Sequence, residues 1–60
     1  MVVSLEDQIR CVDRELAMRR AVYSKRVAAG TMKPEAARRE YDAMQAVRDT
    51  LAGFLAAQTH

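Results

Sequence analysis

The sequence predicts an all-α protein, a two-helix antiparallel hairpin that oligomerises into a helical bundle. Apolar residues recur at steps of three, four or seven on both sides of a single central stretch that runs from Gly30 to Pro34, and the two arms are nearly equal in length. The 60 residues contain no Trp, one Phe and two Tyr, so one copy can bury only a small core. Chains this short are usually stabilised by disulfides, a metal or self-association. We therefore expect a single domain over residues 1–60 that gains stability by oligomerising.

The first helix is expected over about residues 5–28. Ser4 is a plausible N-cap, because its side-chain oxygen can accept a hydrogen bond from a first-turn amide. The helical stripe that should face the second helix consists of Leu5, Ile9, Val12, Leu16, Tyr23 and Val27. This spacing is typical of one buried helix face.

A turn is expected over about residues 29–33, followed by a second helix over about 34–57. Gly30 suits a left-handed cap after the first helix, and Pro34 suits the first position of the second. The stripe expected on the second helix consists of Ala37, Glu40, Met44, Val47, Leu51, Phe54 and Gln58. The short connection favours an antiparallel pair.

The predicted register pairs positions whose numbers add to 63, so that Ile9 faces Phe54 and Tyr23 faces Glu40. Glu40 is the polar residue of its stripe. It is expected to be buried and paired with Tyr23, Arg19 or Arg20. Removing one member of a buried charged pair costs about 3–5 kcal/mol, so Glu40→Ala should destabilise strongly if this register holds.

A second apolar stripe lies on the first helix, about 130° from the main one at 100° per residue. It consists of Cys11, Met18 and Val22. One hairpin can cover only one of the two faces, so these residues are expected to form the oligomer interface. The alternative is that they are scattered surface apolar residues, which are common.

The net charge of +2 is unevenly distributed. Residues 19–39 carry seven cations and one anion, a net +6, whereas residues 1–18 and 40–60 each carry −2. In a hairpin this places the basic charge at the turn end, which favours an anionic ligand such as a nucleotide. The candidate ligand-binding residues are Arg19, Arg20, Tyr23, Arg26, Lys33, Arg38 and Arg39.

Two structural alternatives stand beside that hypothesis. The cations can form a solvated basic face, and Tyr23 can be a core aromatic whose hydroxyl pairs with Glu40. An aromatic ring beside guanidinium groups can instead stack a base while the cations hold phosphate.

The sequence offers no credible catalytic constellation. Its one histidine is His60, Cys11 has no histidine partner, and there is no glycine-rich phosphate loop. We expect no enzyme activity, no metal site and no cofactor. No apolar run is long enough to cross a membrane and no secretion signal is recognisable. The chain is therefore expected to act by binding.

A resemblance to a known family is carried by two segments and several positions of the second helix. These are 14–23 (RELAMRRAVY), 27–32 (VAAGTM), Ala37, Glu40, Met44, 46–47 and 50–51. Over about residues 5–55 the chain resembles small uncharacterised helical-hairpin proteins encoded by phages and prophages of proteobacteria. It departs from their pattern at Ser24, where proline is usual, and at Pro34.

The resemblance implies a protein that acts in the cytoplasm of a bacterial host and neutralises a defence or regulatory factor by stoichiometric binding. With the basic turn end, the leading hypothesis is sequestration of a nucleotide-type ligand by a homo-oligomer. The alternative is an inhibitor that docks onto a host protein such as a transcriptional regulator. A small nucleic-acid-binding protein is a weaker alternative, because no recognition helix or basic arm is evident.

Overall fold

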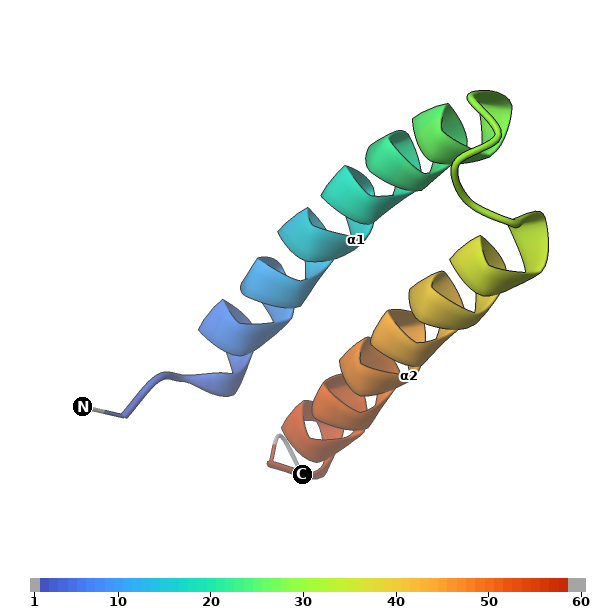
Figure 1. The fold of residues 1–60 in the computed structure, drawn as a ribbon. Coiled ribbons are helices and arrows are strands. Elements are labelled where there is room, and N and C mark those ends of the chain that lie inside the picture. The colour runs from blue at the N-terminus through green and yellow to red at the C-terminus, as the bar shows by residue number, and fades with distance from the viewer. Residues whose placement is uncertain (1, 59–60) are drawn as a thin grey trace.

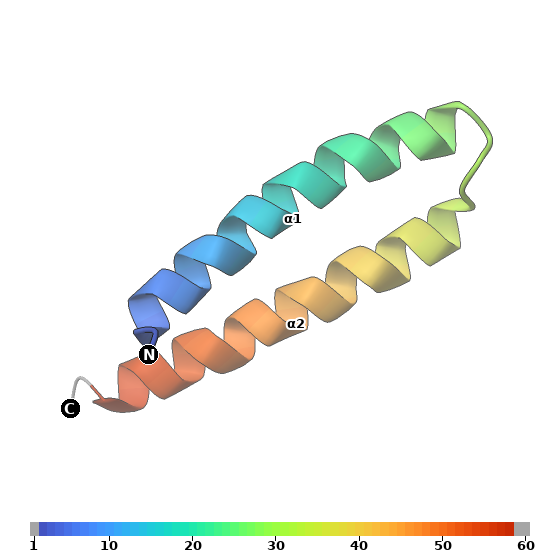
Figure 2. The same ribbon diagram turned by 60° about the vertical axis from the view of Figure 1, so that its left-hand side comes forward.

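Residues 2–58 are described by a computed structural model, in which two antiparallel α-helices are joined by a short turn (Figure 1). Helix α1 spans Leu5–Ala28 and helix α2 spans Pro34–Gln58, one residue beyond the end expected from the sequence. The start of α1 and the end of α2 lie at the same end of the molecule in both views (Figures 1 and 2). The predicted all-α hairpin is confirmed. No helix within residues 2–58 combines the length and the apolar character needed to cross a membrane.

Helix α1 begins with a side-chain cap. The Ser4 hydroxyl accepts a hydrogen bond from the Asp7 amide at 3.1 Å, and the Ser4 carbonyl accepts one from the Gln8 amide at 3.0 Å. The hydroxyl therefore satisfies the Asp7 amide, a first-turn donor without a backbone partner, and the carbonyl accepts the first bond of the helical ladder. Asp7 also accepts a hydrogen bond from Arg10, and this contact, with the arginine charge and the Ser4 hydroxyl, lowers the pKa of the Asp7 carboxyl.

The turn closes α1 with a left-handed glycine. Gly30 has a φ of 78°, and its amide donates to the Val27 carbonyl at 3.1 Å while the Thr31 amide donates to the Arg26 carbonyl at 2.9 Å. These two bonds form a Schellman motif, which occupies carbonyls left free at the helix end. Pro34 then starts α2 at a position where a missing amide hydrogen costs no helical bond.

The core between the helices is small. Among residues 2–58, Ile9 and Leu16 are the buried hydrophobic residues, 9% and 6% exposed. Val12, Tyr23 and Val27 are half-buried on the same face of α1. The stripe predicted for α1 is therefore the face that packs against α2.

Helix α2 is rotated relative to the sequence prediction. Val47 and Phe54, expected in the seam, are 47% and 60% exposed, and Glu40 is exposed and not buried. Ala37, Met44 and Leu51 of the predicted stripe are half-buried, and Tyr41, Arg48 and Leu55 take the seam positions expected for Glu40, Val47 and Phe54. The predicted pairings of Ile9 with Phe54 and of Tyr23 with Glu40 were therefore wrong.

The rotation has a physical reason in two cross-helix polar bonds. Tyr41 and Arg48 both lie in the seam and reach residues of α1 with their polar ends, Arg20 at 3.0 Å and Asp13 at 2.8 Å. Their apolar stems cover the seam while the polar atoms stay at its edge. The sequence prediction placed Val47 and Phe54 in the seam because it considered only apolar residues and gave no weight to amphipathic side chains such as tyrosine and arginine.

The two glycines provide a matched stability test of the turn. Neither position has a heavy atom within 4 Å of an added Cβ, so conformation alone decides the outcome. We expect Gly30→Ala to cost about 1–2 kcal/mol, because L-residues are strained at positive φ. Gly53→Ala, inside α2, should gain about 1 kcal/mol. Thermal melts followed by circular dichroism compare the two, and equal effects at both positions would contradict the left-handed turn.

The corrected burial of Glu40 generates a second prediction. Leu16→Ala removes a buried side chain and should cost about 2–5 kcal/mol, enough to unfold most of so small a protein. Glu40→Ala removes an exposed one and should change the free energy of unfolding by less than about 0.5 kcal/mol. Urea titrations measure both. A large loss at Glu40 would restore the buried-pair hypothesis and overturn the observed rotation of α2.

Candidate functional site: the groove at the turn end

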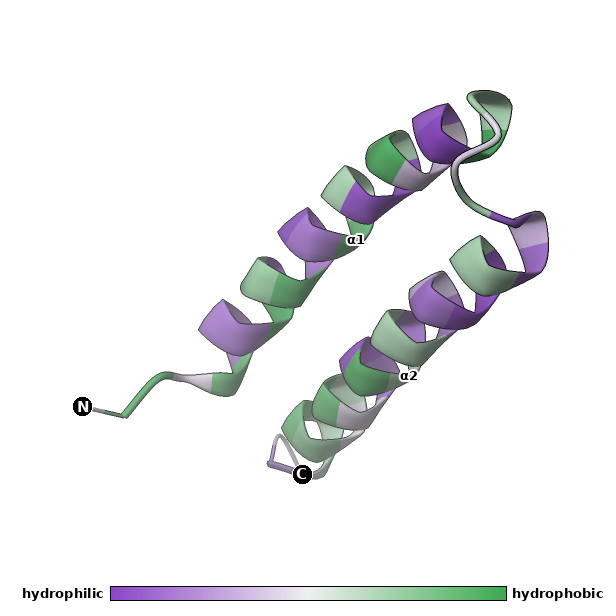
Figure 3. Cartoon of the chain, in the orientation of Figure 1, coloured by the Kyte–Doolittle hydropathy of each residue, from purple (hydrophilic) through white to green (hydrophobic). Residues whose placement is uncertain are grey.

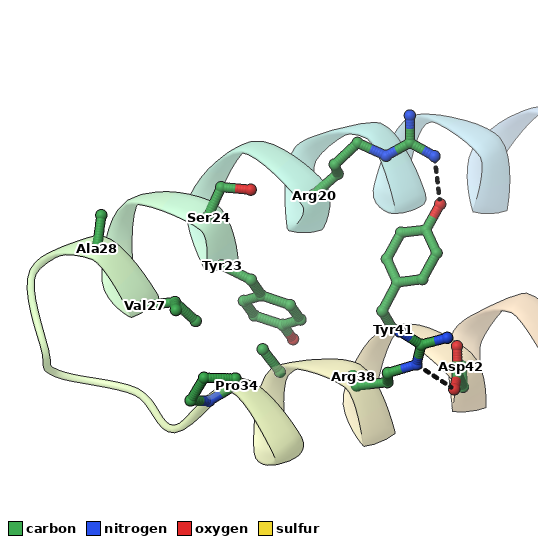
Figure 4. A pocket seen from close by; sticks show the side chains of 10 residues that line it. Arg20, Tyr23, Ser24, Val27, Ala28, Pro34, Arg38, Tyr41 and Asp42 are labelled. Carbon is green, nitrogen blue, oxygen red and sulfur yellow. Dashed lines mark hydrogen bonds and ion pairs between the residues drawn. The ribbon is translucent and has the colours of Figure 1, made fainter.

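A groove of about 660 Å³ opens between the two helices beside the turn (Figure 4). Its apolar lining comes from Tyr23 and Val27 on α1 and from Pro34 and Ala37 on α2. Its polar lining includes Arg20, Arg38, Tyr41 and Asp42. The volume falls in the range of about 300–1,000 Å³ that is typical of small-molecule sites. We refer to this feature as the turn-end groove.

Arg20 and Tyr41 join the two helices at one end of the turn-end groove. The Arg20 Nη2 atom donates a hydrogen bond to the Tyr41 hydroxyl at 3.0 Å, and the guanidinium carbon lies 5.6 Å from the centre of the tyrosine ring (Figure 4). The distance is within the range of a cation–π contact. A positive group and an aromatic ring are thus held together at the groove without using the remaining guanidinium donors.

Arg38 and Asp42 lie one turn apart on α2, beside Tyr41 (Figure 4). Their closest nitrogen–oxygen distance is 3.8 Å, and the two side chains are 83% and 64% exposed. An exposed pair of this kind contributes little to stability. A phosphate oxygen can therefore replace Asp42 as the partner of Arg38 at small cost.

The same side of the hairpin continues away from the turn into a smaller hollow of about 270 Å³, which Arg20 and Tyr41 also line. There Arg48 donates a hydrogen bond to Asp13 at 2.8 Å. This bond, with the aspartate charge, raises the pKa of the Arg48 guanidinium. Because Arg48 is already paired, the unpaired positive charge is concentrated nearer the turn.

The structure brings together three of the seven ligand-binding candidates, since Arg20, Tyr23 and Arg38 line the turn-end groove. Arg19 instead donates to Glu15 at 3.0 Å, and this hydrogen bond is the main cause that raises the pKa of Arg19, against partial desolvation. The remaining three candidates, all exposed and outside the groove lining, are Arg26, Lys33 and Arg39. They add positive charge near the groove.

Tyr41, the residue of α2 that accepts a hydrogen bond from Arg20 of α1 at the groove, was not identified from the sequence. The signal was present in the spacing of Ala37, Tyr41, Met44 and Arg48, which also follows steps of three and four. This spacing competed with the more apolar stripe that runs through Val47 and Phe54 on the neighbouring face of α2. A tyrosine hydroxyl and a guanidinium become partners only when the register of the two helices is known.

Within residues 2–58, no three side chains of His, Cys, Asp or Glu come together in a metal-binding group.

Comparison with known proteins found no matching protein-family model, no matching curated protein and no matching solved structure. The groove is therefore interpreted from its own chemistry.

The Arg20–Tyr41 contact can be measured by a double-mutant cycle. We expect Arg20→Ala and Tyr41→Phe to couple by about 0.5–1 kcal/mol in the free energy of unfolding, the scale of one hydrogen bond, because phenylalanine keeps the ring and removes only the hydroxyl. Arg38→Ala with Asp42→Ala is the matched control and should couple by less than about 0.5 kcal/mol. Urea titration of the four single and two double variants gives both values. A coupling at the first pair no larger than at the control would contradict the contact.

Proposed function

We propose that this protein is a non-enzymatic binder that holds an anionic, nucleotide-type ligand in the turn-end groove, one ligand for each groove. The observation that carries the proposal is the convergence of Arg20, Tyr41 and Tyr23 on an apolar groove at the basic end of the hairpin. A nucleotide presents the matching chemistry, since it combines a flat aromatic base with negatively charged phosphate.

The apolar floor suits the base. Pro34, Ala37 and Val27 leave a surface without competing charge, and the Tyr23 and Tyr41 rings are available for stacking (Figure 4). Stacking of a base on an aromatic side chain contributes about 1–3 kcal/mol. The openness of the site to solvent favours a ligand that keeps part of its surface exposed.

The rim suits phosphate. Arg20 retains donors beyond the one given to Tyr41, and the contact of Arg38 with Asp42 is long, at 3.8 Å, and exposed. The surrounding net charge of +6 over residues 19–39 raises the local concentration of anions. Binding should therefore weaken as salt is added, because screening acts on exposed charges.

The biological setting follows from the sequence resemblance. A phage or prophage protein with this groove would neutralise a host defence or regulatory factor in the bacterial cytoplasm by sequestering its nucleotide signal. The proposal includes self-association, because the exposed Cys11, Met18 and Val22 need cover that the hairpin does not supply.

A second candidate function rests on a different observation. Phe54 is 60% exposed and Met18 is 54% exposed, so the hairpin also presents an apolar surface away from the groove. Such a surface could dock onto a host protein such as a transcriptional regulator. In that case the substitutions Cys11→Ser and Met18→Gln would abolish function while substitutions in the groove would not.

Thermal melts with ligands test the groove. A nucleotide at 100 times its dissociation constant should stabilise the protein by about 2.7 kcal/mol. Inorganic phosphate and adenosine at the same concentration should do far less, because each supplies half of the required chemistry. Arg20→Gln should weaken nucleotide binding by about tenfold or more, which corresponds to the loss of one charge-assisted hydrogen bond.

The matched control is Arg14→Gln, which removes the same charge from an exposed position of α1 outside the groove lining. It should leave nucleotide affinity within about twofold, because a distant exposed charge is screened. Equal losses at Arg14 and Arg20 would show non-specific attraction to charge. No stabilisation by AMP, ATP or a cyclic dinucleotide at millimolar concentration would overturn the proposal.

A further inference from the structure

The hairpin has two different broad sides, identified by the contacts between its helices. One side carries the Arg20–Tyr41 and Asp13–Arg48 bonds and the groove. Arg19, 100° from Arg20 around α1, lies on the other side, where it donates a hydrogen bond to Glu15 at 3.0 Å. That bond is the main cause that raises the pKa of Arg19, and the charges of Glu15 and Glu40 add to it. With 100° of rotation per residue, Cys11, Met18 and Val22 lie further around α1 from the seam than Glu15 does. On α2, Val47 and Phe54 follow Glu40 at steps of seven residues and therefore lie in line with it.

This second side therefore gathers apolar residues from both helices. We define the apolar face as Cys11, Met18 and Val22 of α1 with Val47 and Phe54 of α2, all of them exposed. Hydrophobic residues dominate the C-terminal half of α2, where the apolar face includes Phe54 (Figure 3). The interface expected from the sequence contained only the α1 half of this face.

The solvent-exposed area of the hairpin indicates how much surface a partner would bury. The chain exposes 4731 Å², whereas a compact monomer of 6.8 kDa exposes about 3,950 Å². The excess of roughly 800 Å² equals what one partner buries in a standard protein interface. The radius of gyration of 14.1 Å likewise exceeds the roughly 10.4 Å of a compact 60-residue domain. A second hairpin, with the same 46 Å length and 20 Å width, matches the face that is left open.

Charge decides the direction of the second hairpin. A two-fold axis along the helices would place the turn ends together and bring two blocks of +6 side by side. A two-fold axis across the helices places each basic turn end over the open end of the other copy, where residues 1–18 and 40–60 carry −2 each. Complementary potentials set orientation in this way, and like charges brought together are costly.

We propose that a second copy of this chain packs on the apolar face in the reversed direction, with α1 on α1 and α2 on α2, to form a two-fold four-helix bundle. The inference rests on the proposed self-association and is independent of the ligand in the groove. Both turn-end grooves then face outward at opposite ends of the bundle. The dimer would hold two ligands in separate sites.

The arrangement places particular residues near the two-fold axis. The cross-helix bonds join positions 13 with 48 and 20 with 41, so along the helices Phe54 is at the level of residue 7 and Val47 at the level of residue 14. The apolar face is therefore centred near Val47. Reversal about that centre brings Cys11 of one copy against Met18 of the other and Val47 against its own equivalent.

Disulfide formation tests this geometry in the full-length chain. Met18→Cys with the native Cys11 should form an intermolecular disulfide under mild oxidation. A bridge within one chain is excluded, because seven helical residues span about 10.5 Å and a disulfide requires Cα atoms within about 7 Å. Val47→Cys in a Cys11→Ser background should also cross-link. The matched control is Met18→Cys in the Cys11→Ser background.

Both test variants should give about tenfold or more cross-linked dimer than the control, because neighbouring thiols react at a high effective concentration. Sedimentation of the untreated chain should give twice the 6.8 kDa chain mass. A dimer that cross-links instead between Met18→Cys and Ala43→Cys in the Cys11→Ser background would overturn the reversed direction but keep self-association, because positions 18 and 43 lie at the same level of the two helices. A monomer would overturn both, while nucleotide binding by that monomer would leave the groove proposal standing.

Discussion

The fold depends on the seam between two helices, in which Ile9 and Leu16 are the buried hydrophobic residues among residues 2–58. Two helices in contact cover one stripe on each and leave the opposite faces in water. Within residues 2–58 there is no third helix or strand to close this core. The half-buried Tyr41 and Arg48 extend the seam at its edge with polar bonds to α1 where further apolar contact is absent. The stability of the hairpin, the exposure of its apolar residues and the presence of a groove all follow from this limited burial.

The groove and the apolar face are two consequences of the same geometry. Amphipathic residues of α2 turn towards one side of the seam, so that Arg20 and Tyr41 meet there and enclose an apolar floor next to the turn. The same rotation leaves Val47 and Phe54 exposed, in line with Glu40 at steps of seven residues. If α2 had the rotation predicted from its apolar stripe, Phe54 would be buried and Tyr41 would lie away from Arg20. Ligand binding on one side and self-association on the other are therefore compatible in one small protein, because neither proposal uses the residues of the other.

Several local features could be predicted from the sequence because they depend on neighbouring residues alone. The Ser4 cap, the left-handed Gly30 and the start of α2 at Pro34 reflect backbone preferences that act over four or five residues. The inward stripe of α1 was also predictable, because its six residues outnumber the three of the second apolar stripe, Cys11, Met18 and Val22. The basic charge of residues 19–39 follows from composition, and hairpin topology places it at the turn end.

The rotation of α2, and with it the composition of the site, was decided by the tertiary structure. Two adjacent columns of α2 share Ala37, Met44 and Leu51, so periodicity alone could not choose between Tyr41 and Glu40 as the seam residue. The choice depends on partners more than twenty residues away, Arg20 for Tyr41 and Asp13 for Arg48. For the same reason the sequence identified Arg20, Tyr23 and Arg38 as candidates but included Arg19, which pairs with Glu15 on the opposite side. Length, caps and charge are local properties of the chain, whereas the face that a helix turns towards its neighbour is a property of the pair.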